Sequence, residues 1–140
     1  MTYATQSDLV ERFGADELAQ RTNRAGGQGI DAVVLGRALS DADAEIDGYL
    51  ATRYALPLVS TPAVLVRLAA DLARYQLCGD KVPPTVRQRY EDAVGVLKRL
   101  ASGEVQLSGI TAVPAAGGGG NAVAARAPTR VFSSGLLDSY

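Results

Sequence analysis

Four acidic side chains alternate with other residues in one short stretch, and they form the densest group that could do chemistry. The stretch Asp41-Ala42-Asp43-Ala44-Glu45-Ile46-Asp47-Gly48 has the spacing of a calcium loop, in which alternate carboxylates bind the ion. Such a loop needs glycine at its sixth position and an acid at its twelfth. Counted from Asp41, these positions are Ile46 and Thr52. We therefore predict no metal site and interpret the acids as polar residues of a helix.

The side chains that most enzymes use are scarce. The chain has no histidine, so neither a Ser–His–Asp nor a Cys–His arrangement can form within it. Cys78 is the single cysteine, which excludes an internal disulfide and fits a reducing compartment. The glycines at 26–29 and 117–120 lack the Lys-Ser/Thr of a phosphate-binding loop. We predict a protein that is not an enzyme and binds no cofactor.

The composition is that of one ordinary domain. Of 140 residues, 47% are hydrophobic, which is enough to bury a core. The formal charge of −1 argues against strong non-specific affinity for nucleic acid. Residues 1–8 carry no secretion signal, and no apolar run is long enough to span a membrane. We expect no membrane association.

Apolar residues recur at three- and four-residue steps through the first hundred positions, which is typical of amphipathic helices. The clearest helix is expected at about Ile30–Tyr54. The other expected elements are a helix from the cap Thr5 to Phe13, a short turn at Asp16–Arg21, a helix with Thr61 as cap and Pro62 first, and a helix from Val86 to Leu100 after a turn at Pro83-Pro84. These patterns predict an all-α fold, a small bundle of about four helices spanning residues 1–103.

The chain changes character after Gly103. Residues 104–128 are rich in Gly and Ala and are expected to be a linker, with an alternation at 104–107 that is compatible with a short strand. Residues 129–140 regain bulky apolar groups, and we expect them to be a docking arm at the end of an extended, flexible tail. The alternative is that the tail folds back onto its own body.

Charge is separated along the chain. Residues 29–57 hold two basic and five acidic groups, a balance of −3, whereas residues 81–103 hold five basic and two acidic groups, a balance of +3. A subunit with an acidic and a basic side could pack head-to-tail into a ring. The residues predicted for this subunit interface are Arg87, Arg89, Asp43 and Asp47. The alternative is that these two helices are neighbours in one subunit or are solvated.

The stretch ALSDADAEIDGYLATRYALPL at residues 38–58 is distinctive. It resembles the central block of the head–tail connector, or neck adaptor, proteins of Mu-like phages and prophages. Weaker similarity to this family extends over YATQSDL at residues 3–9, LARYQL at residues 72–77, YEDA at residues 90–93 and RVFS at residues 130–133. The resemblance therefore covers nearly the whole chain except the glycine-rich insert.

This resemblance implies a structural protein of the virion, assembled in the host bacterial cytoplasm and located in the neck. Copies would form a homo-oligomeric ring, with twelve subunits by family resemblance, that extends the DNA channel below the portal. The expected partners are the portal protein and other neck or tail-completion proteins. Genomic DNA would pass through the ring without sequence readout, and the family carries no catalytic motif.

The docking arm is expected to bind the portal or a neighbour, because aromatic and Arg side chains are frequent interface anchors. Its predicted contact residues are Arg130, Phe132, Leu136, Leu137 and Tyr140. Asp41 and Glu45 are predicted to face the channel, where acids would repel the DNA backbone. Two alternatives for the function remain, namely a head-completion or tail-completion protein of the neck, and a small DNA-binding regulator of packaging.

Overall fold

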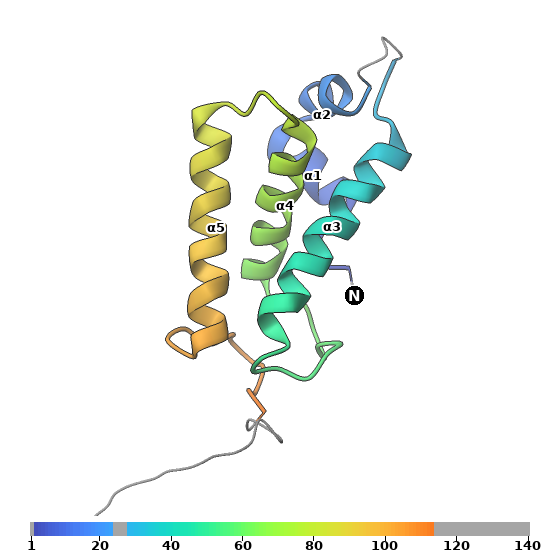
Figure 1. Cartoon of the computed structure of the whole chain (residues 1–140). Coiled ribbons are helices and arrows are strands. Elements are labelled where there is room, and N and C mark those ends of the chain that lie inside the picture. The colour runs from blue at the N-terminus through green and yellow to red at the C-terminus, as the bar shows by residue number, and fades with distance from the viewer. Residues whose placement is uncertain (1, 24–27, 114–140) are drawn as a thin grey trace, which may run out of the picture.

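The computed structural model describes residues 2–23 and 28–113. These residues form five α-helices: α1 Gln6–Phe13, α2 Ala15–Thr22, α3 Ala32–Leu50, α4 Ala63–Cys78 and α5 Pro84–Ser102. The long helices α3, α4 and α5 stand side by side, and the short helices α1 and α2 pack near one end of α3 and α4 (Figure 1). The described residues contain no strand, so the predicted all-α fold is confirmed.

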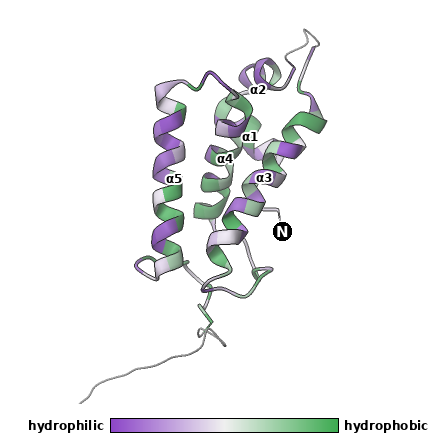
Figure 2. Ribbon diagram, in the orientation of Figure 1, coloured by the Kyte–Doolittle hydropathy of each residue, from purple (hydrophilic) through white to green (hydrophobic). Residues whose placement is uncertain are grey.

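Helix α4 is the centre of the body. It packs between α3 and α5, and residues 68–73 are all buried. A helix enclosed in this way must be apolar around most of its circumference. Figure 2 shows α4 mostly green, whereas α5 carries purple residues along its outer face. The largest fully buried side chains are Leu9, Leu18, Leu35, Ile46, Leu50, Leu65, Leu68, Leu72, Val86, Leu97 and Leu100.

The start of α1 is formed as the sequence predicts. The Thr5 hydroxyl accepts the Asp8 N–H at 3.3 Å, and the Asp8 carboxylate accepts the Thr5 N–H at 2.9 Å. This capping box satisfies two donors that would otherwise lack partners. Gly14 ends α1 with φ of 92°, and α2 begins at the next residue. The expected turn at Asp16–Arg21 is part of this full helix, so the described body has five helices rather than about four.

Helix α3 is shorter than the predicted Ile30–Tyr54. It begins at Ala32 because the Asp31 carboxylate accepts the N–H groups of Val33 and Val34, at 3.0 and 3.2 Å. It ends at Leu50 because the Leu50 carbonyl accepts the N–H groups of both Arg53 and Tyr54, which closes a tight turn.

The proline positions at two helix starts differ from the prediction. Pro62 is the cap of α4, with extended backbone, and α4 begins at Ala63, so the expected cap at Thr61 is wrong. Pro84 is the first residue of α5 instead of part of the turn. Its missing N–H costs nothing there, because the first N–H groups of a helix have no intrahelical partner.

Residues 104–113, expected to begin the linker, pack against the end of the body. Leu107 is buried, and its N–H donates to the Tyr54 hydroxyl at 3.1 Å. The Val113 N–H donates to the Arg53 carbonyl at 2.8 Å. The strand considered for residues 104–107 does not form, because the Val105 N–H bonds back to the Arg99 carbonyl and Leu107 bonds a side chain instead of a neighbouring strand.

Candidate functional site

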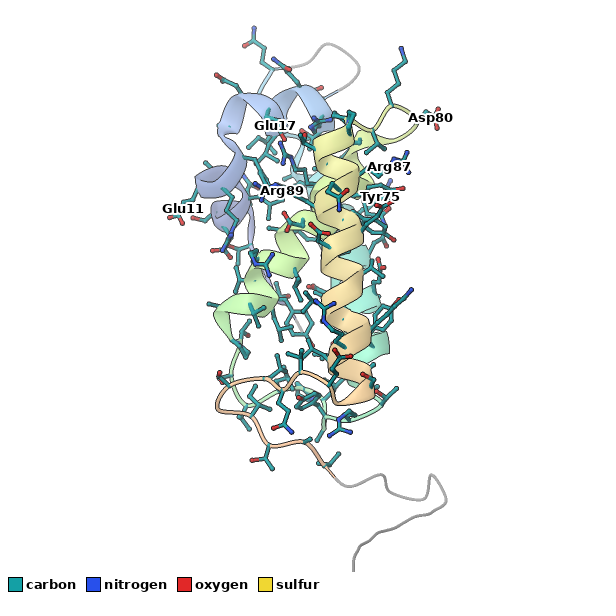
Figure 3. The ribbon with its side chains drawn as sticks, turned by 90° about the vertical axis from the view of Figure 1, so that its left-hand side faces the viewer. Glu11, Glu17, Tyr75, Asp80, Arg87 and Arg89 are labelled. Carbon is teal, nitrogen blue, oxygen red and sulfur yellow. The ribbon has the colours of Figure 1, made fainter. Side chains whose placement is uncertain are left out.

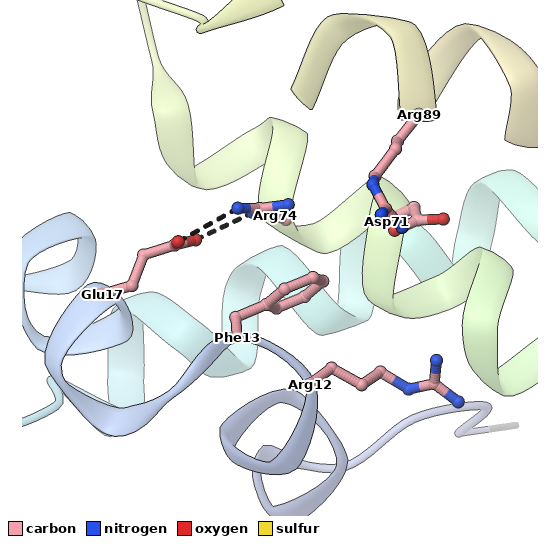
Figure 4. Close-up of a pocket in the computed structure, with 6 residues that line it drawn as sticks. All are labelled: Arg12, Phe13, Glu17, Asp71, Arg74 and Arg89. Carbon is pink, nitrogen blue, oxygen red and sulfur yellow. Dashed lines mark hydrogen bonds and ion pairs between the residues drawn. The ribbon is translucent and has the colours of Figure 1, made fainter. Parts of the chain in front are cut away.

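A polar pocket of about 370 Å³ lies where α1, α2, α4 and α5 meet, and we call it the arginine pocket. Figure 4 shows the side chains of these four helices around it. The lining residues are Arg12, Phe13, Glu17, Asp71, Arg74 and Arg89. They are distant in sequence, so only the packing of the short helices against α4 and α5 brings them together.

Arg74 joins α4 to α2 at one wall of this pocket. Its Nε and Nη2 atoms donate to the two carboxylate oxygens of Glu17 at 2.8 and 3.0 Å, and its guanidinium lies 4.4 Å from the centre of the Phe13 ring. Burial works to raise the pKa of Glu17, but the guanidinium groups of Arg74 and Arg21 outweigh it and hold that pKa below its usual range. Arg74 is therefore already paired within the chain.

Asp71 is a buried carboxylate at the floor of the pocket. It is 4% exposed, and its Oδ2 atom lies 3.9 Å from Nη1 of Arg67. Burial raises the pKa of Asp71, although the nearby cations Arg89, Arg67, Arg12 and Arg74 oppose this shift. Arg67, Asp71 and Arg74 are three and four residues apart and so share one side of α4, yet Asp71 is buried there. The signal that was missed is an acid inside the otherwise apolar run 68–73.

Replacing Asp71 by asparagine should remove a pH-dependent cost of folding. Because the pKa of Asp71 is raised in the folded state, that state binds more protons than the unfolded chain as the pH rises above 3.8. The free energy of unfolding of the wild type should therefore fall, relative to Asp71→Asn, as the pH rises from 3.8 through the raised pKa. Urea unfolding of both proteins at a series of pH values measures this. A difference that stays constant with pH would contradict it.

Two acids of α3 hold the N-terminal segment of the chain. Asp43 accepts the Tyr3 N–H at 3.0 Å, and Asp47 accepts the Tyr3 hydroxyl. Tyr3 is buried, and this burial together with Asp47 raises the pKa of its phenol. The Nε atom of Arg53, in the turn after α3, is buried and has no hydrogen bond in the described residues. The interface role of Asp43 and Asp47 stays a prediction.

The other two acids lie on a different side of α3. Glu45 accepts the hydroxyl of Tyr90 from α5 at 3.3 Å, and the Tyr90 ring stacks on Tyr75 with centroids 3.9 Å apart. Asp41 is exposed and lines a shallow hollow with Gln76 of α4. The acids therefore do not form one continuous face. The predicted channel-facing role of Asp41 and Glu45 stays a prediction.

Arg87 and Arg89, predicted together for the subunit interface, point to opposite sides of α5. Figure 3 shows Arg89 on the side of Glu17, whereas Arg87 lies on the side of Tyr75. Only Arg89 lines the arginine pocket. Helices α3 and α5 are neighbours in the same subunit, as the alternative expected, but no ion pair joins them within residues 28–113.

A second candidate surface lies at the opposite end of the body from α2, where the loop 51–62 and the segment 103–113 meet (Figure 1). We call it the apolar base. Its exposed apolar side chains are Leu56, Val59, Val105 and Val113. Val59 is 90% exposed, the highest value among the large apolar side chains described. An adjoining pocket of about 360 Å³ is lined mostly by apolar residues, among them Val64, Val96 and Leu107. The apolar base is therefore a candidate surface for contact with another protein.

The remaining predictions concern metals, membranes and the arm. In the described part of the chain, no cluster of three acids or cysteines is arranged to hold a metal ion, and no helix is both long and apolar enough to cross a membrane. The predicted docking arm lies outside the described residues. This applies to Arg130, Phe132, Leu136, Leu137 and Tyr140.

Comparison with known proteins gives consistent matches. The family described as Bacteriophage Mu, Gp36 matches residues 3–125, which include all five helices and end before the predicted arm. The chain is 38% identical over 105 residues to the Mu-like prophage FluMu protein gp36 of Haemophilus influenzae, covering 75% of this chain and 74% of that protein. It is 38% identical over 106 residues to Gene product J of Escherichia phage Mu, covering 74% of each.

Proposed function

The chain belongs to the bacteriophage Mu Gp36 family, and from this premise we propose that it is a structural virion protein that connects head to tail. Copies form a ring below the portal in the virion neck, extend the DNA channel and bind the next neck or tail protein. Genomic DNA passes through without sequence readout. In this proposal the protein catalyses no reaction and needs no cofactor, and it is assembled in the host bacterial cytoplasm.

The observation that carries this proposal is the apolar base. Tyr54 and Leu107 are buried directly beneath it, so the base is a defined part of the body. A valine that is 90% exposed, with three further exposed apolar side chains at the same end, has hydrophobic surface still to bury. A protein whose task is to join two larger assemblies needs such a surface. We assign the apolar base to contact with a neck neighbour, and residues 129–140 to a second contact with the portal.

Removing the chain from the phage or prophage that encodes it should leave DNA-filled heads and separate, complete tails. The physical reason is that the bridging surface between the two assemblies is lost while each assembly still forms. Electron microscopy of lysates measures the fraction of joined particles, and the full chain supplied in trans should restore it. Joined particles without the chain would overturn the proposal. Empty heads would favour a packaging regulator, and malformed tails would favour a tail-completion protein.

A matched pair of valines tests the apolar base in the same assay. Val59→Asp places a charge on the apolar base and should reduce joining by about tenfold or more. Val33→Asp is the control, because Val33 is also exposed, at 64%, but lies at the start of α3 near the other end of the body. An acid is tolerated at that position, since it lies in the first turn of a helix. If Val59→Asp and Val33→Asp changed the fraction of joined particles equally, the apolar base would not be the contact with a neck neighbour.

A further inference from the structure

The arginine pocket contains positive charge that the chain itself does not neutralise. Arg74 is paired with Glu17, but Arg12 and Arg89 are exposed and make no ion pair within residues 2–23 and 28–113. Three guanidinium groups line the pocket against two carboxylates. Since Asp71 at the floor is 4% exposed, a ligand that enters would meet the two exposed arginines first. The pocket is therefore suited to one further anionic group.

The shape and surroundings of the pocket favour a single carboxylate over a nucleic acid. Binding of a phosphate backbone requires several cations along an extended surface. Here Glu17 and Asp71 lie inside the pocket, and Glu11 lies on the same side of the body (Figure 3). These acids would repel neighbouring phosphates but leave room for one carboxylate between Arg12 and Arg89. Arg–carboxylate pairs also gain from bidentate geometry.

The four acids at residues 41–47 of α3, which belong to the acidic segment of the chain, differ in whether they already have a partner. Asp43 and Asp47 are bonded to Tyr3, and Glu45 is bonded to Tyr90. Asp41 alone among these four is exposed and has no ion pair or hydrogen bond in the described residues, although Arg37 lines the same hollow. Asp41 is therefore available to another molecule.

The placement of Asp41 satisfies the geometry of a ring contact. Asp41 lines its hollow beside Gln76, whereas the arginine pocket is lined by Asp71. Gln76 follows Asp71 by five residues, which places the two side chains about 140° apart around α4. The acidic and basic sites thus lie on different sides of one body. A head-to-tail contact requires this arrangement, since each copy must offer one site to the copy before it and the other to the copy after it.

We propose that the arginine pocket receives the Asp41 carboxylate of a second copy of this chain, with Arg12 and Arg89 as its ligands. This inference rests on the proposed ring. It names the subunit contact within that ring and assigns Asp41 to it instead of to the channel wall. Arg87, on the far side of α5, has no part in this contact.

A charge exchange tests the contact in the full-length protein. Sedimentation equilibrium should show self-association of the wild type. Arg89→Glu and Asp41→Arg should each weaken the association constant by about tenfold or more, because each places like charges together. The double variant restores an opposite pair and should recover most of the loss, and circular dichroism of each single variant checks that it is folded. Lys98→Glu is the control, since Lys98 is also an exposed cation of α5 but lies outside the pocket, and it should associate like the wild type.

Three outcomes would overturn this proposal: a wild type that stays monomeric, an Arg89→Glu variant that associates normally, or a double variant no better than its parents. The same variants supplied to phage that lack the chain separate this failure from failure of the neck function. If Arg89→Glu associates normally and still joins heads to tails, the proposed pocket contact is wrong but the proposed connector function is retained. If the wild-type chain itself is dispensable for joining, the proposed connector function is wrong.

Discussion

Replacing Tyr54 by alanine should lower the free energy of unfolding by about 3–5 kcal/mol. The Tyr54 ring is 2% exposed and fills the end of the core, and its hydroxyl accepts the Leu107 N–H at 3.1 Å. Alanine leaves a cavity beneath the apolar base and removes the partner of a buried N–H. Residues 104–113 would then lose one of the contacts that hold them to the body. Denaturant unfolding followed by circular dichroism measures the change.

Tyr54→Phe distinguishes the contribution of the ring to stability from that of the hydroxyl. Phenylalanine fills the same space but cannot accept the Leu107 N–H, so the expected loss is about 1–3 kcal/mol, the cost of one unsatisfied buried group. The difference between the stability losses of Tyr54→Ala and Tyr54→Phe measures the cost of the cavity that alanine leaves. An alanine variant that loses no more stability than the phenylalanine variant would show that the ring does not fill the core.

Replacing Gly103 by alanine should lower the free energy of unfolding by about 2 kcal/mol or more, in two parts. Gly103 ends α5 with φ of 88°, where a Cβ atom costs about 1–2 kcal/mol. That Cβ would also lie 2.6 Å from Nη1 and 2.7 Å from Cζ of Arg53, so the guanidinium must move. The Nε of Arg53 is buried, so the side chain must be displaced from a packed position. Thermal and denaturant unfolding measure the total.

Two other glycines serve as comparisons for the loss of stability at Gly103. Gly14 has φ of 92° and ψ of 146°, with no atom within 4 Å of an added Cβ, so Gly14→Ala should show the strain of its own backbone without a clash. Gly48 is inside α3 with the same open space, so Gly48→Ala should stabilise the helix by about 0.5–1 kcal/mol. The part of the Gly103→Ala loss that comes from Arg53 should vanish in an Arg53→Ala background. A Gly103→Ala loss of the same size with and without the Arg53 side chain would show that Arg53 does not press against Gly103.

Both predictions concern the residues that shape the apolar base. The Tyr54 hydroxyl accepts the Leu107 N–H. The Arg53 side chain lies against Gly103, and the Arg53 carbonyl accepts the Val113 N–H. The surface that we assign to a neck neighbour is therefore supported by hydrogen bonds between segments about fifty residues apart, as the Tyr54–Leu107 separation of 53 shows. Variants that loosen this support should reduce head–tail joining in proportion to the stability they lose.

Helix positions and several helix ends could be predicted because they depend on local sequence. The three- and four-residue apolar steps of α3 place Leu35, Ala38, Ala42, Ile46 and Leu50 on one buried face, as predicted. The capping box of Thr5 and the left-handed cap at Gly103 are formed by residues next to their own helices. The family could also be recognised from the central block at residues 38–58.

The arginine pocket could not be predicted, because no local rule joins its parts. Arg12, Glu17, Asp71 and Arg89 come from four helices, and their meeting depends on how the short α1–α2 pair crosses α4. The same applies to the acids of α3. Their spacing shows that they are helical, but only the positions of Tyr3 and Tyr90 decide which are bonded and which one, Asp41, remains available.

The all-α class, the main helices and the phage family follow from short stretches of sequence, because helical period, caps and a distinctive block act over a few residues. Three features depend on the packing of the helices. Asp71 is buried, and Arg87 and Arg89 lie on opposite sides of α5. The two segments that carry Leu56, Val59, Val105 and Val113 lie at the same end of the body. Burial and convergence depend on contacts between residues far apart in the chain, which the local pattern does not contain.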